Sequence, residues 1–384
     1  MLTAVSLGKV AYKSMNSKSQ KILEDSSIAN NPSRSGRPSR EEEKASLAGY
    51  DSAALERFHA DLAQAHIRGQ WQNEVLRKSG NAGVWSDGSL APKSGGQPFL
   101  WKWRLIKGFL EQSCLAVPES YTSRRSLMFN NPELARGTTN TINMGVQMIR
   151  PGEMAWAHRH SISALRFVIS GDPNIFTVVD GVRCAMETGD LILTPQWRWH
   201  DHNNQTANPA IWLDVLDGPV IGAFNQVVFE SYGERQQPIL NYESDVAEDG
   251  QVLRFRFQDV VAALAAMPQE AVSAADGFVY EYRDPVTAQA PLPTLGCRML
   301  RLAAGFSGEN CRRSTSEIYH VVRGHGRAII GDRVLEWGPG DCFALPNWSW
   351  RSIQNASSEE DALLFAAHDR PLIDMLGLYR EARG

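Results

Sequence analysis

The sequence has no long apolar run. Hydrophobic residues make up 43% of its 384 positions, yet none of its apolar runs approaches the roughly 18 residues that a membrane-spanning helix requires. The N-terminus also lacks the continuous apolar core of a secretory signal. We therefore expect a chain without membrane contact that stays in the cytoplasm.

Paired cysteines and an excess of basic residues are missing too. The cysteines are odd in number, scattered, and without C-x-x-C spacing, which indicates reduced thiols rather than a disulfide framework. These residues are Cys114, Cys184, Cys297, Cys311 and Cys342. A net charge of -4 and a pI near 6.2 provide no basic field for nucleic acid or anionic lipid. Small molecules and proteins remain as partners.

The first third of the chain differs in texture from the rest. Residues 1–45 are dominated by a polar, Ser- and Asn-rich stretch that cannot bury enough apolar surface, so we expect a disordered tail. Residues 46–120 should form a helical segment, because 51–71 and 101–115 place apolar residues at helical spacing. A Gly-, Pro- and Ser-rich loop at 80–98 separates these two helices.

Beyond about residue 140 the sequence alternates short apolar runs with turn residues, and this pattern occurs twice. Residues 151–171 align without gaps on 304–324, at an offset of 153 positions. Residues 189–204 align on 340–355 at an offset of 151. Two matches in the same order indicate a duplicated β domain.

The duplication predicts a mainly β chain with two related barrels. We expect the first barrel at 121–235 and the second at 276–384. The linker between them, 236–275, contains a helical pattern at 256–267.

Two histidines lie one residue apart in a strand-like run of the first copy. Strand alternation points His158 and His160 to the same face, so both imidazoles can bind one metal ion. A third ligand must come from a neighbouring strand, and the later run of the same copy offers His200 and His202.

The spacing around these histidines resembles the two cupin motifs. The matching positions are Gly152, His158, His160, Ala164 and Gly171 in the first motif and Gly189, Pro195, His200 and Asn204 in the second. The resemblance implies a bicupin of two jelly-roll barrels and makes His200 the third ligand. The usual glutamate is Ala164 here, and the usual glycine is Trp197. Three neutral histidines leave a divalent metal with open positions for an anionic substrate and O2.

The second copy lacks this ligand set. At the positions of the three histidines it carries Cys311, Arg313 and Arg351, and an arginine cannot deprotonate to bind a metal. We therefore expect a metal-free barrel. Glu317 occupies the position of the motif's glutamate and should pair with Arg313 or Arg351, while Cys311 should be a buried, inert thiol.

Three stretches around the histidines read HRHSISALRFVISG, LTPQWRWHDHNN and WLDVLDGPVI. They resemble the gentisate 1,2-dioxygenase family, which includes salicylate and 1-hydroxy-2-naphthoate dioxygenases, and the resemblance extends from about Gln97 to Ile373. It implies a homotetramer that uses Fe(II) and O2 to cleave the bond between the carboxyl- and hydroxyl-bearing carbons of an ortho-hydroxybenzoate. Gentisate, giving maleylpyruvate, is the first candidate substrate. Salicylate, substituted salicylates and 1-hydroxy-2-naphthoate are the alternatives.

The same resemblance suggests roles for further residues. Arg166 lies on the alternating face of the histidines and is expected to bind the substrate's carboxylate, unless it is a surface arginine. Arg124 or Arg125 matches a second substrate-binding arginine, and the sequence leaves the choice open. His202 is expected to pair with Asp214 and either accept the phenolic proton or orient the oxygenated intermediate, although Asp214 could equally be a structural acceptor.

Two positions bear on the substrate. The family often has tryptophan where this chain has Asn143, and Gly145 lies where salicylate-type members carry small residues. Both features predict a wide, polar pocket, which keeps larger substrates open.

A non-oxidative cupin is the alternative from another class. A three-histidine site can bind Zn, Mn or Ni, and cupins also act as isomerases and binding proteins. Oxygen uptake discriminates between these possibilities, because an isomerase consumes none.

Overall fold

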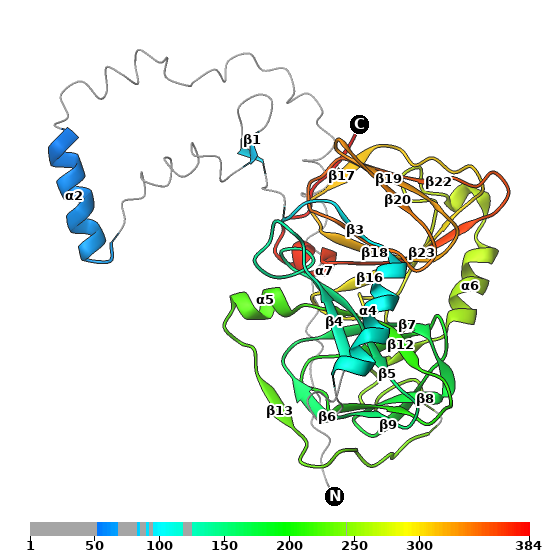
Figure 1. The fold of residues 1–384 in the computed structure, drawn as a ribbon. Coiled ribbons are helices and arrows are strands. Elements are labelled where there is room, and N and C mark those ends of the chain that lie inside the picture. The colour runs from blue at the N-terminus through cyan, green and yellow to red at the C-terminus, as the bar shows by residue number, and fades with distance from the viewer. Residues whose placement is uncertain (1–51, 68–82, 85–89, 92–94, 118–124, 243) are drawn as a thin grey trace, which may run out of the picture. The chain divides into compact units, whose positions relative to one another are not determined.

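The computed structural model describes residues 52–67, 83–84, 90–91, 95–117, 125–242 and 244–384 (Figure 1). The predicted tail, most of the predicted 80–98 loop and Arg124 lie outside these residues. The chain divides into two units, residues 1–79 and 80–384. In the first unit the predicted helix at 51–71 is α2, Ser52–Gln64. None of the described helices has both the length and the apolar composition needed to cross a membrane.

The first barrel consists of two antiparallel sheets. Its strands are β4 (Arg125–Phe129), β5 (Asn143–Ile149), β6 (Met154–His160), β7 (Ala164–Ser170), β8 (Asp172–Val179), β9 (Val182–Met186), β10 (Leu191–Thr194), β11 (His200–Asn204), β12 (Ala210–Leu216), β13 (Phe229–Ser231) and β14 (Arg254–Phe255). The larger sheet has the order β14-β10-β7-β12-β5-β4 and the smaller one β13-β6-β11-β8-β9. Helix α5, Gly218–Ala223, follows β12.

The second barrel repeats this plan. Its strands are β15 (Phe278–Glu281), β16 (Gly296–Leu302), β17 (Cys311–Arg313), β18 (Glu317–Arg323), β19 (Gly326–Ile330), β20 (Arg333–Trp337), β21 (Cys342–Leu345), β22 (Arg351–Asn355), β23 (Ala362–His368) and β24 (Glu381–Arg383). They are joined by β3 (Phe99–Trp101) in the sheet order β15-β16-β23-β18-β21-β3, and the smaller sheet is β20-β19-β22-β17-β24. Helix α7, Arg370–Met375, follows β23 as α5 follows β12. The prediction of a mainly β chain with two related barrels is confirmed.

Strand alternation divides the apolar residues among three cores. In β7, Leu165 and Phe167 belong to the largest cluster, whereas Val168 belongs to the cluster inside the first barrel. The largest cluster contains residues of both six-stranded sheets, and Phe167 stacks on Phe365 of the second barrel with ring centroids 4.6 Å apart. The two large sheets therefore pack face to face, and each barrel keeps an interior of its own.

Two strand–helix units cross between the barrels. β3 precedes the first barrel in sequence but pairs with β21 of the second, and the cyan β3 lies beside the second barrel in Figure 1. β14 precedes the second barrel but pairs with β10 of the first. The following helices, α4 (Trp103–Ala116) and α6 (Phe257–Ala266), occupy the ranges predicted to be helical. The domain limits proposed from the sequence stay predictions, since strands near each limit complete the neighbouring barrel.

Helix α4 forms because its apolar residues repeat at helical spacing. Ile106 and Leu110, four residues apart, are its two buried side chains and both belong to the shared core. α4 contacts β4 and β5 of the first barrel, although the strand before it belongs to the second. The crossing units thus attach each barrel to the other.

Candidate functional site

The structure brings the three predicted metal ligands together inside the first barrel. His158 and His160 lie at the end of β6, and His200 begins the neighbouring strand β11, directly opposite His158. One ring nitrogen from each residue lies within 4.8 Å of the others. Period-two alternation on β6 and antiparallel pairing with β11 are sufficient to produce this cluster.

Each of the three imidazoles is oriented by a backbone carbonyl. Nδ1 donates to Trp156 O at 2.6 Å in His158, to Ile162 O at 2.6 Å in His160 and to Arg198 O at 2.9 Å in His200. A carbonyl can only accept, so the proton lies on Nδ1 and Nε2 is the nitrogen available to a metal. His200 Nε2 is fully buried, and among the described residues it has no hydrogen-bond partner. A divalent cation would satisfy this nitrogen, so the residues fit a metal.

The electrostatics of His200 keep its ring neutral. Burial lowers the pKa of His200 well below its usual value, and Arg166 and the neighbouring histidines lower it further. A neutral imidazole is the form that binds a metal, so this environment favours metal binding over protonation.

Arg166 is buried in the wall of the same barrel. It lies on β7 with only 2% of its surface exposed, opposite Asp214 of β12. Its Nε is 3.1 Å from Asp214 Oδ1, and its Nη1 donates to Thr194 Oγ1. The alternative of a surface arginine is therefore wrong. Two fixed partners hold the guanidinium plane in one orientation.

His202 and Asp214 each have a partner that the sequence did not indicate. His202 Nδ1 is hydrogen-bonded to Thr177 Oγ1 at 2.6 Å, because β8 places Thr177 opposite His202. Asp214 Oδ1, which pairs with Arg166, also accepts the indole N–H of Trp212 at 3.2 Å. The predicted pair of His202 and Asp214 stays a prediction.

Of the two candidate arginines, Arg125 lies within the described residues, and it is held by a carboxylate. Arg125 is 6% exposed, and its Nη1 forms an ion pair with Glu153. Burial raises the pKa of Glu153. Its hydrogen bonds and charge interactions with Arg125 and Arg150 lower the pKa by more, so that it lies below its usual value. In β4, Arg125 shares its face with Leu127 and Phe129, which pack in the core between the barrels. Arg125 therefore serves an ion pair on that face.

Gly145 and Asn143 lie on β5, on the face of the large sheet that carries Arg166. Gly145 is opposite both Asp214 of β12 and Met128 of β4. A Cβ at Gly145 would be 2.6 Å from Leu127 O and 2.7 Å from Met128 Sδ, so the close approach of β4 requires glycine. Two residues away, Asn143 lies opposite Leu216 at the end of β12.

The equivalent position in the second barrel contains a network of buried ion pairs. Glu317 lies 2.7 Å from Arg298, 3.5 Å from Arg313 and 3.7 Å from Arg351. The predicted pairing of Glu317 is thus confirmed with both arginines. Asp276, which the sequence did not indicate, lies 2.7 Å from Arg313 and from Arg351. Burial opposes ionisation of Glu317, but the arginines lower its pKa to about 2.

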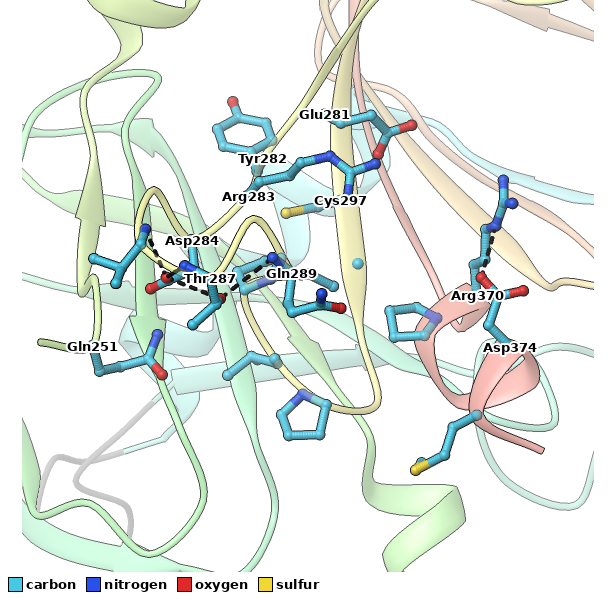
Figure 2. Close-up of a pocket in the computed structure, with 18 of the residues that line it drawn as sticks. Gln251, Glu281, Tyr282, Arg283, Asp284, Thr287, Gln289, Cys297, Arg370 and Asp374 are labelled. Carbon is cyan, nitrogen blue, oxygen red and sulfur yellow. Dashed lines mark hydrogen bonds and ion pairs between the residues drawn. The ribbon is translucent and has the colours of Figure 1, made fainter. Parts of the chain in front are cut away.

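A cavity of about 790 Å³ lies beside the second barrel and contains none of the candidate site residues (Figure 2). It is lined by the loop after β15 and by α7. In Figure 2 Arg370 pairs with Asp374, and the hydroxyl of Thr287 donates to Asp284. The three-histidine cluster of the first barrel lies outside this cavity.

Comparison with known proteins supports this assignment. The cupin domain family model matches residues 145–216 and 298–368, one segment in each barrel. A 1-hydroxy-2-naphthoate 1,2-dioxygenase from a Nocardioides species is 35% identical, over 86% of this chain and 88% of its own. A 5-aminosalicylate 1,2-dioxygenase from a Comamonas species and a gentisate 1,2-dioxygenase from Aquipseudomonas alcaligenes are each 34% identical, over 85% of this chain and 90% and 95% of theirs.

A solved structure extends the match to three dimensions. The salicylate 1,2-dioxygenase of Pseudoaminobacter salicylatoxidans, determined as an adduct with gentisate, superposes with a TM-score of 0.75 and 26% identity. The match covers 87% of this chain and 95% of that one. The chain therefore belongs to the bicupin family of gentisate, salicylate and 1-hydroxy-2-naphthoate 1,2-dioxygenases, which are ring-cleaving enzymes.

Proposed function

We propose that His158, His160 and His200 hold Fe(II) and that the enzyme cleaves gentisate to maleylpyruvate. The observation that carries the proposal is the cluster of three histidines whose Nδ1 atoms are all committed to carbonyls, beside the buried Arg166. When bound, Fe(II) supplies open positions for the substrate's oxygens and for O2. Side chains of the barrel bind the substrate's carboxylate and accept its phenolic proton.

Arg166 holds the carboxylate of the substrate in this proposal. Its contacts with Asp214 and Thr194 fix the guanidinium before the substrate arrives. A carboxylate on the substrate complements this cation in a buried setting, where a charge-assisted hydrogen bond is strong. Arg124 and Arg125 both remain candidates for a second contact with the substrate, and Arg125 is already paired with Glu153.

His202 accepts the proton of the phenolic hydroxyl. Its Nδ1 is bonded to Thr177, so Nε2 is the atom that would receive the proton. Its ring centroid is 5.9 Å from that of His200, a proximity that supports the role of a base beside the metal ligands. Asp214 supports this base either directly or by holding Arg166 in place.

A bicyclic substrate, 1-hydroxy-2-naphthoate, is the second candidate. Gly145 carries no side chain opposite Asp214, and Asn143 follows on the same face of β5. Asn143 stands where the family often has tryptophan, and this smaller side chain favours room for a second ring, whereas β4 fills the space beside Gly145. Salicylate and 5-substituted salicylates share the carboxylate and hydroxyl groups and remain alternatives.

Family membership supports two further proposals, a homotetramer and a cytoplasmic location. Light scattering coupled to gel filtration would measure the mass of the assembly. A mass of four chains supports the tetramer, and the mass of a single chain contradicts it.

Oxygen uptake tests the proposed reaction most simply. The Fe(II)-loaded protein is offered gentisate, salicylate, 5-substituted salicylates and 1-hydroxy-2-naphthoate, and a ring-opened chromophore is followed. We expect uptake with at least one substrate, loss of uptake in His158→Ala, and retention in the matched variant Cys311→Ala of the second barrel. A metal-binding protein that consumes no oxygen with any of them would instead be a non-oxidative cupin.

A further inference from the structure

Two hydrogen bonds join the barrels at equivalent places. Thr294, in the loop between β15 and β16, donates to Asp217 Oδ2 of the first barrel at 2.6 Å. Thr141, in the loop between β4 and β5, donates to Asp369 Oδ2 of the second barrel at 2.6 Å. The two threonines are 153 positions apart and the two aspartates 152, so the duplication that produced the barrels also repeated this contact.

Each aspartate also anchors a turn of its own barrel. Asp217 Oδ1 accepts the backbone N–H of Ser163 at 2.8 Å, and Asp369 Oδ1 accepts that of Ser316 at 2.9 Å. Ser163 and Ser316 are again 153 positions apart. We call each set of threonine, aspartate and serine a clasp: the Thr294 clasp supports the first barrel and the Thr141 clasp the second.

The two clasps differ in what they support. Ser163 follows Ile162, whose carbonyl accepts Nδ1 of the metal ligand His160 at 2.6 Å. The backbone carbonyl of His160 in turn accepts the N–H of Trp197 at 2.8 Å. In the second barrel the position of His160 is occupied by Arg313, which is held by Asp276. The Thr294 clasp therefore ends at a metal ligand, and the Thr141 clasp ends at an ion pair.

Burial makes both aspartates depend on their donors. Asp217 and Asp369 are 1% and 2% exposed. Burial raises the pKa of both carboxyl groups, that of Asp369 to about 6, while the hydrogen bonds of the clasp oppose the rise. Removing a threonine hydroxyl leaves a buried carboxylate oxygen without that donor, which is costlier than losing an exposed hydrogen bond.

The loop that presents Thr294 is braced internally. Asp284 Oδ1 accepts the backbone N–H groups of Val286 and Thr287 at 3.0 and 2.8 Å. Figure 2 shows Asp284 and Thr287 turned toward each other beside the cavity. A braced loop can hold Thr294 in place for a contact with another domain.

We propose that Thr294 of the second barrel is a positioning residue for the metal site of the first, acting through Asp217 and Ser163 on the turn that orients His160. This gives the second barrel a part in the reaction without a metal of its own. The inference rests on the proposed metal site.

Paired variants test the inference on the full-length protein. Thr294→Val and Thr141→Val remove the same hydroxyl from the two clasps, and each should lower the melting temperature by a similar amount. Affinity for Co(II), measured by competition with a chromogenic chelator, should fall about 10-fold in Thr294→Val, as for other residues that orient metal ligands. It should not change in Thr141→Val, and Thr294→Ser should restore it.

Three results would overturn the inference: unchanged Co(II) affinity in Thr294→Val, an equal loss in Thr141→Val, or no rescue by Thr294→Ser. If the valine variants do not fold, Asp217→Asn and Asp369→Asn repeat the comparison at the acceptor, with the same expected difference. The affinity for Co(II) is measured in the absence of substrate and oxygen. Failure of the dioxygenase proposal would therefore leave this result interpretable, and an absence of Co(II) binding in the unmodified protein would instead reject the metal site itself.

Discussion

The two barrels share a scaffold but treat positive charge in opposite ways. The first presents three histidines arranged to bind an added cation, while the second carries Arg298, Arg313 and Arg351 as cations of the chain itself. The carboxylates of Asp276 and Glu317 pair with these arginines, and Glu381 lies 3.4 Å from Arg313 as well. The comparison teaches that the same β framework can obtain its buried positive charge either from a bound cation or from its own arginine side chains.

The two barrels also differ in the side chains at equivalent positions of their large sheets. Gly145 of β5 corresponds to Arg298 of β16, and Arg166 corresponds to Tyr319, both at the offset of 153. Arg298 Nη2 lies 2.7 Å from Glu317 and 3.2 Å from the hydroxyl of Tyr319, so a charged side chain lies where the first barrel has Gly145 packed against β4. The second barrel therefore has an ion-paired side chain at a position that carries none in the first.

The largest effect should come from removing a metal ligand. His200→Ala deletes the buried nitrogen of β11, and we expect bound iron and oxygen uptake to fall by at least about 100-fold, the upper range for residues that merely orient ligands. Metal analysis and an oxygen electrode would measure both. Normal iron content in this variant would contradict the assignment of the site.

The equivalent change in the second barrel should affect stability instead. Arg351→Ala removes a cation that is 1% exposed and leaves Asp276 and Glu317 with less compensation. We expect a loss of about 3–5 kcal/mol in the free energy of unfolding, measured with urea, and unchanged iron per folded chain. A stable variant that had lost its iron would contradict the assignment of metal binding to the first barrel and of the stabilising ion pairs to the second.

A smaller effect should distinguish substrate binding from metal binding. Arg166→Lys keeps a charge but cannot reproduce the planar contact with a carboxylate, so kcat/KM should fall by roughly 10-fold while bound iron is retained. Arg254→Lys is the control, because Arg254 is another buried arginine of the first barrel and its partners Glu187 and Asp190 lie outside the proposed substrate contacts. Equal losses in the two variants would argue against a carboxylate-binding role for Arg166.

The smallest effect should appear in acid. The folded pKa of Glu317, about 2, is below the ordinary value of 4.5, so its ionisation stabilises the fold above about pH 4 and that contribution is lost as the pH falls toward 2. Glu317→Gln should therefore show a flatter dependence of unfolding free energy on pH in this window, although its overall stability is lower. An unchanged slope would contradict the buried network.

The sequence was informative where the geometry is local. The ligands His158 and His160 follow from alternation within one strand, and the pairing of Glu317 with Arg313 follows from the repeat. Thr177 and Asp276 could not be predicted, because their contacts arise from strand register and from a loop with no motif spacing.

Other contacts could have been predicted from the sequence. Thr141 and Thr294 recur at the offset of the repeat, so the duplication itself could have indicated the clasps. The choice between Arg124 and Arg125 stays a prediction. The face of β4 to which Arg125 belongs could not be assigned from alternation alone without a known neighbour. Burial of Leu127 and Phe129 in the shared core provides that neighbour.

The division of labour between the barrels is tested most directly by counting iron atoms per chain after anaerobic loading with Fe(II). The measurement is made on the unmodified protein, on His158→Ala and on the matched variant Cys311→Ala. We expect one iron per chain in the unmodified protein and in Cys311→Ala, and almost none in His158→Ala. Two irons per chain, or full retention by His158→Ala, would contradict the account.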